Sequence, residues 1–184
     1  MKIIAALLLA AAAGQVSAAV FNTPVANKSA VTFVSKQMGV AVNGGFGKFT
    51  SQISFDPDRQ ETGKAQLDVV LASVDAGSSD ANDTVKGKSW FDVKDYPVAT
   101  FVSSSLKRLG GNRYQATGRL TIKGRARDVI VPFTATQAGA NLLLDGAIPI
   151  SRTQYGIGEG SWADPSVVAD EVQIRFHFTL GAGK

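Results

Sequence analysis

The side chains best suited to catalysis are few in this sequence and stand apart from one another. His177 is the only histidine, and it lies between Arg175 and Thr179 with neither a second metal ligand nor a nucleophile beside it. A histidine needs such partners to hold a metal or to activate a nucleophile. We therefore interpret His177 as a solvated residue on a polar strand face. The absence of cysteine excludes thiol catalysis and cysteine metal sites.

Two further patterns resemble chemical motifs but lack the setting that the chemistry needs. Ser104 and Lys107 have the S-x-x-K spacing, which works when both residues share a helix face, whereas this copy lies at the end of an expected strand. Acidic residues also occur in three close pairs, Asp56 with Asp58, Asp92 with Asp95, and Asp170 with Glu171. Turns and helix caps supply such pairs freely, and a calcium loop needs further oxygen ligands in register. The sequence predicts no metal site, no required cofactor and no catalytic site.

The strongest pattern is an alternation of apolar and polar residues. In residues 172–180 (VQIRFHFTL), the apolar residues from Val172 to Leu180 occupy every second position and would share one face of a β-strand. Similar segments lie at 29–36, 49–55, 66–71, 99–103, 113–123, 129–133 and 142–150. This pattern predicts an all-β fold of about eight antiparallel strands. The strands could close into a barrel, which removes exposed edges, or stack as a two-layer sandwich.

Two segments interrupt the strands. Residues 80–91 offer Asp80 or Asn82 as a helix cap and predict a short helical segment before Pro97. Residues 156–170 contain Trp162 and predict a long loop or short helix that covers one end of the barrel.

The chain length indicates a single domain, and the N-terminal sequence indicates that this domain is exported. At 184 residues the chain is long enough for one domain, and its net charge of +4 is spread along the sequence, which does not favour nucleic-acid binding. Lys2 is followed by an apolar run from Ile3 to Ala13 and by Val16-Ser17-Ala18. This arrangement predicts a secretory signal peptide over residues 1–18, too short to span a bilayer. The mature domain is then 19–184, without an integral membrane segment.

The strand faces leave open whether the interior is solid. An eight-stranded barrel is just wide enough to be filled by side chains or to hold one slender apolar ligand. Small residues occupy several of the positions expected to face inward, namely Ala99, Ser103, Ala116, Gly118 and Gly146. Aromatic residues are more often core than ligand contacts, so a filled interior is the alternative to a cavity.

Several longer passages resemble one known family. They are SAVTFVSKQMGVAVNGGFGKF (29–49), WFDVKDYPVATFVSSSL (90–106), YQATGRLTIKGRARDVIVPF (114–133) and ISRTQYGIGEGSWADPSVVADEVQIRF (150–176). In this order they are similar to the YceI-like family of exported, polyisoprenoid-binding proteins. The resemblance spans nearly the whole of the chain after residue 18. One departure is local: residues 81–85 (ANDTV) lack the family's usual charged pattern, and Trp90 stands where phenylalanine is usual.

The resemblance implies a lipocalin-like barrel with a long internal pocket for a polyprenyl tail, an isoprenoid quinone or a fatty-acid derivative. It also implies a non-catalytic periplasmic protein for lipid transport or storage and a homodimer. A stress-linked interaction protein with a filled barrel is the alternative, and a lipid-modifying enzyme is a further one. The ligand-binding residues that we predict are Phe33, Phe49, Phe55, Trp90, Phe91, Phe101, Gly118, Leu120, Ile122, Phe133, Arg152, Trp162, Phe176 and Phe178. We place Arg152 at the mouth, where its guanidinium could hold a polar head group or pair with a nearby carboxylate.

Overall fold

A computed structural model describes residues 19–183, and the predicted signal peptide, residues 1–18, lies outside them. The strands are β1 (Phe21–Pro24), β2 (Ala30–Gln37), β3 (Val40–Phe46), β4 (Phe49–Ser54), β5 (Lys64–Val70), β6 (Val74–Asp75), β7 (Val98–Gly110), β8 (Arg113–Ile122), β9 (Arg125–Ala138), β10 (Asn141–Ser151) and β11 (Glu171–Ala182). One α-helix, α1 (Ser79–Lys86), and five short 3-10 turns complete the described part, the turns spanning Ala26–Lys28, Gln60–Thr62, Leu71–Ser73, Thr153–Tyr155 and Gly160–Trp162. The all-β prediction and the short helix are confirmed.

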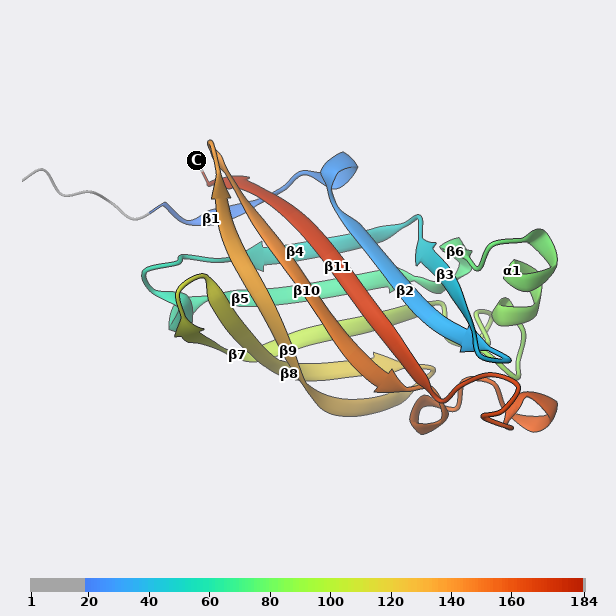
Figure 1. The fold of residues 1–184 in the computed structure, drawn as a ribbon. Helices are drawn as coiled ribbons and strands as arrows, with labels where there is room; N and C mark the ends of the chain where they lie inside the picture. Colours follow the sequence, from blue (N-terminus) through green and yellow to red (C-terminus); the bar gives the residue numbers. More distant parts are fainter. Residues whose placement is uncertain (1–18, 184) are drawn as a thin grey trace, which may run out of the picture.

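All the strands belong to one antiparallel sheet that curls strongly on itself. The hydrogen-bonded order is β4-β5-β7-β8-β9-β10-β11-β2-β3-β6, and β1 pairs with β11 off this path. The long strands β9, β10 and β11 therefore cross over β4, β5 and β7 at a steep angle (Figure 1). The two crossing layers enclose an interior between them.

The sheet differs from the closed eight-stranded barrel that the sequence predicts. Eleven strands are present in residues 19–183, and the path of pairing begins at β4 and ends at β6 without closing. At one end the gap is bridged by β1, because Phe21 and Phe55 exchange backbone hydrogen bonds of 2.9 and 3.0 Å. The fold is a half-barrel that β1 closes at one end only.

The alternation read from the sequence sets the faces of the strands. Along β8, every second residue from Tyr114 to Ile122 is buried, and the residues that alternate with them, such as Gln115 and Arg119, lie on the outer face. His177 lies on the outer face of β11, where its Nδ1 is 2.6 Å from Asp145 Oδ1 and its side chain is 40% exposed. The prediction that His177 is a solvated residue is therefore confirmed.

The end of the interior next to β1 is solid core, and we call it the packed end. Its centre is Phe55, which has no exposed surface and whose ring lies edge-on to Tyr114 at 5.0 Å and to Phe133 at 5.8 Å between centroids. Leu142 and Leu180 are almost or fully buried beside the same strands. The C-terminus and β1 lie at this end, whereas α1 and the segment before β11 lie at the other (Figure 1).

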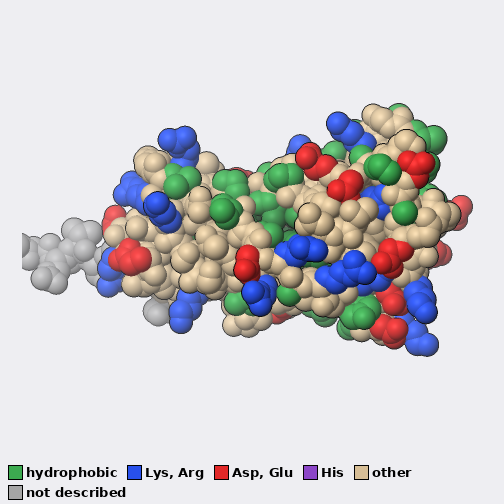
Figure 2. Space-filling view, turned by 90° about the horizontal axis from the view of Figure 1, so that it is seen from below, with side chains coloured by type: hydrophobic (Ala, Val, Ile, Leu, Met, Phe, Trp, Pro, Cys, Tyr) green, Lys and Arg blue, Asp and Glu red, His purple; other side chains and the backbone are tan. Residues whose placement is uncertain are grey.

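Charge on the outside of the molecule is dispersed. Seen from below, Lys and Arg side chains are spread over the length of the molecule with Asp and Glu among them (Figure 2). Within residues 19–183, no helix has the length and apolar character needed to cross a membrane.

Candidate ligand-binding pocket

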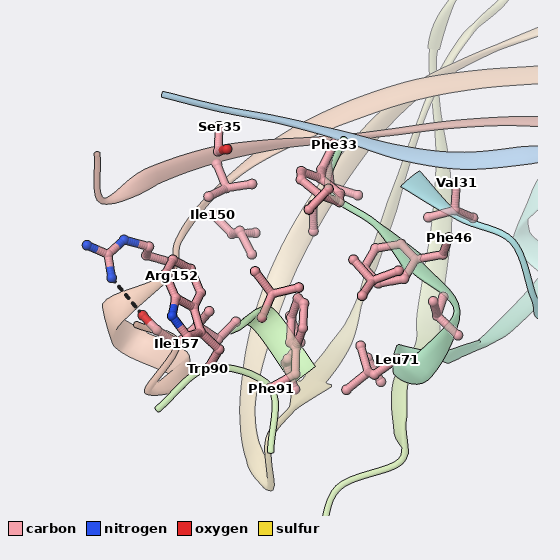
Figure 3. A pocket seen from close by; sticks show the side chains of 18 of the residues that line it. Val31, Phe33, Ser35, Phe46, Leu71, Trp90, Phe91, Ile150, Arg152 and Ile157 are labelled. Atoms are coloured by element: carbon pink, nitrogen blue, oxygen red, sulfur yellow. Dashed lines mark hydrogen bonds between the residues drawn. The ribbon is translucent and has the colours of Figure 1, made fainter. Parts of the chain in front are cut away.

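The interior at the α1 end, which we call the pocket end, holds a cavity of about 340 Å³. This volume falls at the lower end of the range typical of small-molecule sites. Side chains from the strands point into it, among them Val31, Phe33, Phe46 and Ile150, while Leu71 and Phe91 approach from connecting segments (Figure 3). The wall is therefore mainly aliphatic and aromatic, which suits an apolar guest.

Eight of the predicted ligand-binding residues line this cavity. They are Phe33, Trp90, Phe91, Phe101, Leu120, Ile122, Arg152 and Trp162. Their role in binding stays a prediction, but the structure brings them together from β2, β7, β8, the segment after α1 and the segment between β10 and β11. The covering role predicted for residues 156–170 agrees with the positions of Ile157, Trp162 and Val168 on the cavity wall.

The other predicted residues lie away from the cavity. They are Phe49, Phe55, Gly118, Phe133, Phe176 and Phe178. The five aromatic residues pack against one another or against other aromatic rings near the packed end, with Phe49 edge-on to Phe178 at 6.0 Å and Phe176 stacked on Phe178 at 5.5 Å. Within residues 172–180, only Val172 and Ile174 line the cavity.

Gly118 shows why the two small inward glycines do not create the cavity. A Cβ atom added to Gly118 would lie 2.6 Å from Phe101 Cζ, because the phenylalanine ring on β7 lies across the glycine. Gly146 is covered in the same way by the ring of Phe176. A large ring over a neighbouring glycine fills the space that the missing side chain leaves. The prediction that these glycines leave room for a ligand is therefore wrong.

Sequence reasoning also missed part of the wall. Val31 shares the alternating face of β2 with Phe33, so the strand pattern contained the signal for it. Leu71 belongs to a 3-10 turn after β5, and Ile157 and Val168 belong to the covering segment. The covering segment has no strand period, so the sequence gives no direction for Ile157 and Val168, whereas Leu71 ends the alternating segment 66–71.

Arg152 fastens the covering segment to the sheet. It is 1% exposed, and its Nε, Nη1 and Nη2 groups donate five hydrogen bonds of 2.7 to 3.1 Å to backbone carbonyls. The acceptors are the carbonyl oxygens of Ile157, Gly158, Trp162, Val168 and Ala169; the bond to Ile157 is drawn in Figure 3. A guanidinium has five N–H donors, so all of them are used within the chain.

The burial of the guanidinium affects the pKa of Arg152 and restricts which residue can stand at position 158. Burial lowers the pKa of Arg152, while the charge of Asp170 acts in the opposite direction. Gly158 is required where it stands, because its φ of 75° is left-handed and the Arg152 guanidinium occupies the place of a side chain. Neither of the two roles that the sequence left open for Arg152 anticipated this arrangement.

A second set of polar contacts holds the covering segment from outside. Lys123 Nζ donates to the carbonyl oxygens of Lys88 at 2.9 Å and Gly156 at 2.7 Å and lies 3.1 Å from Glu159 Oε2. Arg125 is 3.1 Å from the other carboxylate oxygen. The hydrogen bond and charge of Lys123, with a smaller contribution from Arg125, lower the pKa of Glu159.

Trp90 contributes an unusual group to the cavity wall. Its ring lies edge-on to Trp162 at 5.5 Å, and the Arg152 guanidinium carbon is 5.8 Å from the ring centroid. Its Nε1 is buried without a hydrogen-bond partner, the only such side-chain nitrogen or oxygen among residues 19–183. A buried donor without a partner costs about 1–3 kcal/mol.

Helix α1 supplies a polar edge. Its N-cap is Ser78, whose Oγ accepts a hydrogen bond from Ala81 N at 3.2 Å. Asp80 and Thr84 lie on the side of α1 that lines the cavity, and Ser35 lines it from β2. Among residues 19–183, no group of three acidic or histidine side chains is placed to hold a metal ion.

A curled antiparallel sheet around an apolar pocket, with a polar edge and a fastened covering segment, defines an all-β protein with an internal apolar cavity. The family model of the YceI-like domain matches residues 23–180. The chain belongs to the YceI-like family, which confirms the resemblance found in the sequence.

Individual relatives agree with this assignment. The chain is 51% identical to BcnA of Burkholderia cenocepacia, with a TM-score of 0.83 over 85% of this chain and 98% of the BcnA chain. It also shares its fold with a polyisoprenoid binding domain from Saccharophagus degradans, implicated in plant cell wall breakdown, at a TM-score of 0.67 and 16% identity over 91% of this chain and all of that one. A UPF0312 protein of Azotobacter vinelandii is 30% identical over 71% of this chain and 70% of its own length.

Proposed function

We propose that this protein is a non-catalytic carrier or reservoir that holds the tail of a long-chain amphiphilic lipid, such as a polyisoprenoid, an isoprenoid quinone or a fatty-acid derivative. The observation that carries the proposal is the apolar cavity of about 340 Å³ at the pocket end. The structural neighbour from Saccharophagus degradans, described as a polyisoprenoid binding domain, supports the same class of ligand. The filled interior that we considered as the alternative applies only to the packed end.

The physical basis of such binding is the removal of methylene groups from water. Each buried methylene contributes roughly 0.8 kcal/mol, so a tail can be held without a precise polar contact along its length. We expect selection among tails by length more than by chemical detail. A water-soluble carrier of this kind would act between two membranes, which fits the periplasmic location that we propose from the predicted signal peptide over residues 1–18. The homodimer stays a prediction from the family resemblance.

The proposal is tested by filling the cavity from its wall. Ala99 is 8% exposed and lines the cavity from β7, so Ala99→Phe should occupy the space of a tail and abolish binding of the neutral dye Nile red. Ser105→Phe places the same ring at an exposed position of the same strand and is the matched control. Mass spectrometry of an organic extract of the protein from its native host should show a long-chain compound in the wild type and none in Ala99→Phe.

The outcome against the proposal is equally definite. Equal dye binding and equal extracted lipid in wild type and Ala99→Phe, with both folded by circular dichroism, would mean that this cavity is not the lipid site. Ala81→Phe fills the cavity from α1 instead and serves if Ala99→Phe does not fold.

A further inference from the structure

The hairpin that joins β2 to β3 exposes two apolar side chains at its turn, residues 38–40, which we call the tip. Met38 is 72% exposed and Val40 is 68% exposed, more than any other large apolar side chain in residues 19–183. The hairpin ends at the pocket end, opposite the C-terminus (Figure 1). Neither side chain therefore contributes much burial to the folding of the protein.

The backbone of the tip makes methionine a costly residue there. Met38 and Gly39 have φ values of 47° and 79°, the left-handed pair of a two-residue hairpin turn that favours Asn, Asp and Gly. Other residues are strained in this region, and an exposed apolar side chain gains nothing in return within the fold. Folding therefore does not account for a methionine at position 38, whereas contact with an external apolar surface does.

The tip also continues the cavity wall. Val42 and Phe46 line the cavity from β3, and Val40 lies on the same side of the strand because side chains repeat with a period of two. The register agrees, since Val40 is opposite Gln37, which also lines the cavity. One row of side chains on β3 therefore leads from the cavity wall to the tip.

Hydrogen bonds fix the tip beside the covering segment. Met38 N donates to the carbonyl oxygen of Val167 at 2.9 Å, and Ala169 N donates to that of Lys36 at 2.9 Å. The same segment is bonded to the sheet by Arg152. The two apolar side chains are therefore held outward by a fixed part of the structure.

The charges beside the tip have both signs. Lys36 precedes it on β2, and Asp164 lies in the covering segment, where its carbonyl oxygen accepts a hydrogen bond from Val167 N at 3.1 Å. Both charged residues are exposed. A zwitterionic bilayer surface also carries both signs, whereas an anionic surface attracts clusters of Lys and Arg. The surroundings of the tip therefore suit a neutral bilayer.

We infer that the tip docks reversibly on the surface of a neutral lipid bilayer, with Met38 and Val40 entering its apolar boundary. The driving force is the removal of two side chains from water, which is weak enough for the protein to leave again. Docking would bring the row of side chains on β3 against the bilayer, so that a tail could pass to the cavity without crossing water. The inference rests on the proposed function only for this cargo.

Flotation of the purified protein with phosphatidylcholine vesicles tests the docking. We expect the double variant Met38→Asn, Val40→Thr to bind at least about tenfold more weakly than wild type. Asparagine suits the left-handed turn and threonine keeps a β-branched side chain, so the variant should fold. Ile130→Thr is the matched control and should bind as wild type does, because Ile130 is 60% exposed but lies on β9, away from the tip.

A fluorescent label beside the tip reports the same contact directly. The chain has no cysteine, so Ala41→Cys provides a single attachment point for an environment-sensitive nitrobenzoxadiazole label on an exposed residue next to Val40. With phosphatidylcholine vesicles, its emission should rise about twofold or more and shift to the blue as the label leaves water. Ala140→Cys carries the label at the exposed turn of the β9–β10 hairpin, at the packed end, and its emission should stay unchanged (Figure 1).

The outcomes separate the docking from the proposed function. Vesicle binding that is lost in the double variant and kept in Ile130→Thr supports the docking, whether or not the cavity binds Nile red. Wild type that binds Nile red but no vesicles would overturn the inference and leave the proposed function standing.

Two further results would assign the contact to something else. Binding that requires phosphatidylglycerol in the vesicles and disappears in high salt would overturn the inference, since charge would then hold the protein on the membrane. A double variant that changes the sedimentation of the protein alone, and not its flotation with vesicles, would assign the tip to contact with a second copy of the chain, and the inference would be wrong.

Discussion

The two ends of the curled sheet are built from the same strands but stabilised in different ways. Strand β8 buries Tyr114 and Ala116 in the packed end and turns Leu120 and Ile122 toward the cavity. Strand β11 likewise runs from Val172 and Ile174 on the cavity wall to Phe178 and Leu180 in solid core. One alternating pattern therefore forms a solid core over half its length and a cavity wall over the other half.

The difference shows how a protein keeps a cavity without collapsing around it. At the packed end, interlocking aromatic rings remove apolar surface from water, which is the main source of folding stability. The pocket end leaves such surface uncovered, so its covering segment is fixed by polar contacts instead. The five bonds of Arg152 and the contacts of Lys123 with Glu159 have this role. Close packing and the cavity thus lie at different ends.

The largest expected effect comes from emptying the packed end. Phe55→Ala removes a ring with no exposed surface that lies against Tyr114 and Phe133. We expect it to lower the free energy of unfolding by about 3–5 kcal/mol, since neighbouring rings cannot collapse fully into the space. Phe91→Ala at the pocket end removes a partly buried ring that faces the cavity and should cost only about 1–2 kcal/mol. Urea unfolding measures both.

The same pair of variants should behave in the opposite order toward Nile red. Phe91→Ala changes the cavity wall and should weaken dye binding, whereas Phe55→Ala should leave it unchanged under conditions where the variant is still folded. Equal losses of stability in the two variants would show that the two ends are stabilised alike, and the comparison would then be wrong.

A smaller effect is expected from releasing the covering segment. Arg152→Met keeps most of the side-chain length but removes all five donors, leaving buried carbonyls such as those of Ile157 and Val168 without partners. We expect a loss of about 2–4 kcal/mol in the free energy of unfolding. Cleavage within 153–170 by a protease in the native state should also become faster than cleavage elsewhere.

Arg152→Lys tests whether the number of bonds matters or only the charge. Lysine has three donors on one nitrogen and cannot reach five carbonyls. It should therefore lie between wild type and Arg152→Met in both measurements. Full recovery of stability by lysine would show that the buried charge alone fixes the segment.

The sequence predicted the faces of the strands better than it predicted what those faces contact. Alternation in β8 and β11 correctly gave the inward residues, because side chains of a strand point to opposite sides with a period of two. The period is the same along the whole strand, so it does not distinguish Leu120 at the cavity from Tyr114 in the core. That distinction depends on the crossing strands, which are distant in the sequence.

Closure of the sheet and the function of individual residues were predicted less well for similar reasons. Whether β4 pairs with β3 or β6 depends on how far the sheet curls, which no local pattern records. Gly118 was predicted to leave space because the sequence does not show that Phe101 lies across it. The sequence predicts Arg152 at the mouth of the pocket, whereas it is 1% exposed and lines the wall, and its carbonyl partners come from a segment without a repeating pattern.

The smallest expected effect concerns the ionic contact at the outside of the pocket end. The pKa of Glu159 is lowered from its ordinary value of 4.5, first by Lys123 and then by Arg125. A carboxyl group whose pKa is lowered by folding adds stability above its ordinary value, and that stability is lost as the pH falls through the folded value. The side chain of Glu159 is 52% exposed, so solvent screening limits the contribution to below about 1 kcal/mol at pH 7.

Glu159→Gln should therefore be slightly less stable than wild type at pH 7, and the difference should shrink as the pH falls below 4.5. It should shrink in high salt as well, because screening weakens the attraction of Lys123 and Arg125 for the carboxylate. Urea titrations of both proteins across this range measure the difference, and a gap that stays constant with pH and salt would assign the stability to packing of Glu159 and not to its charge.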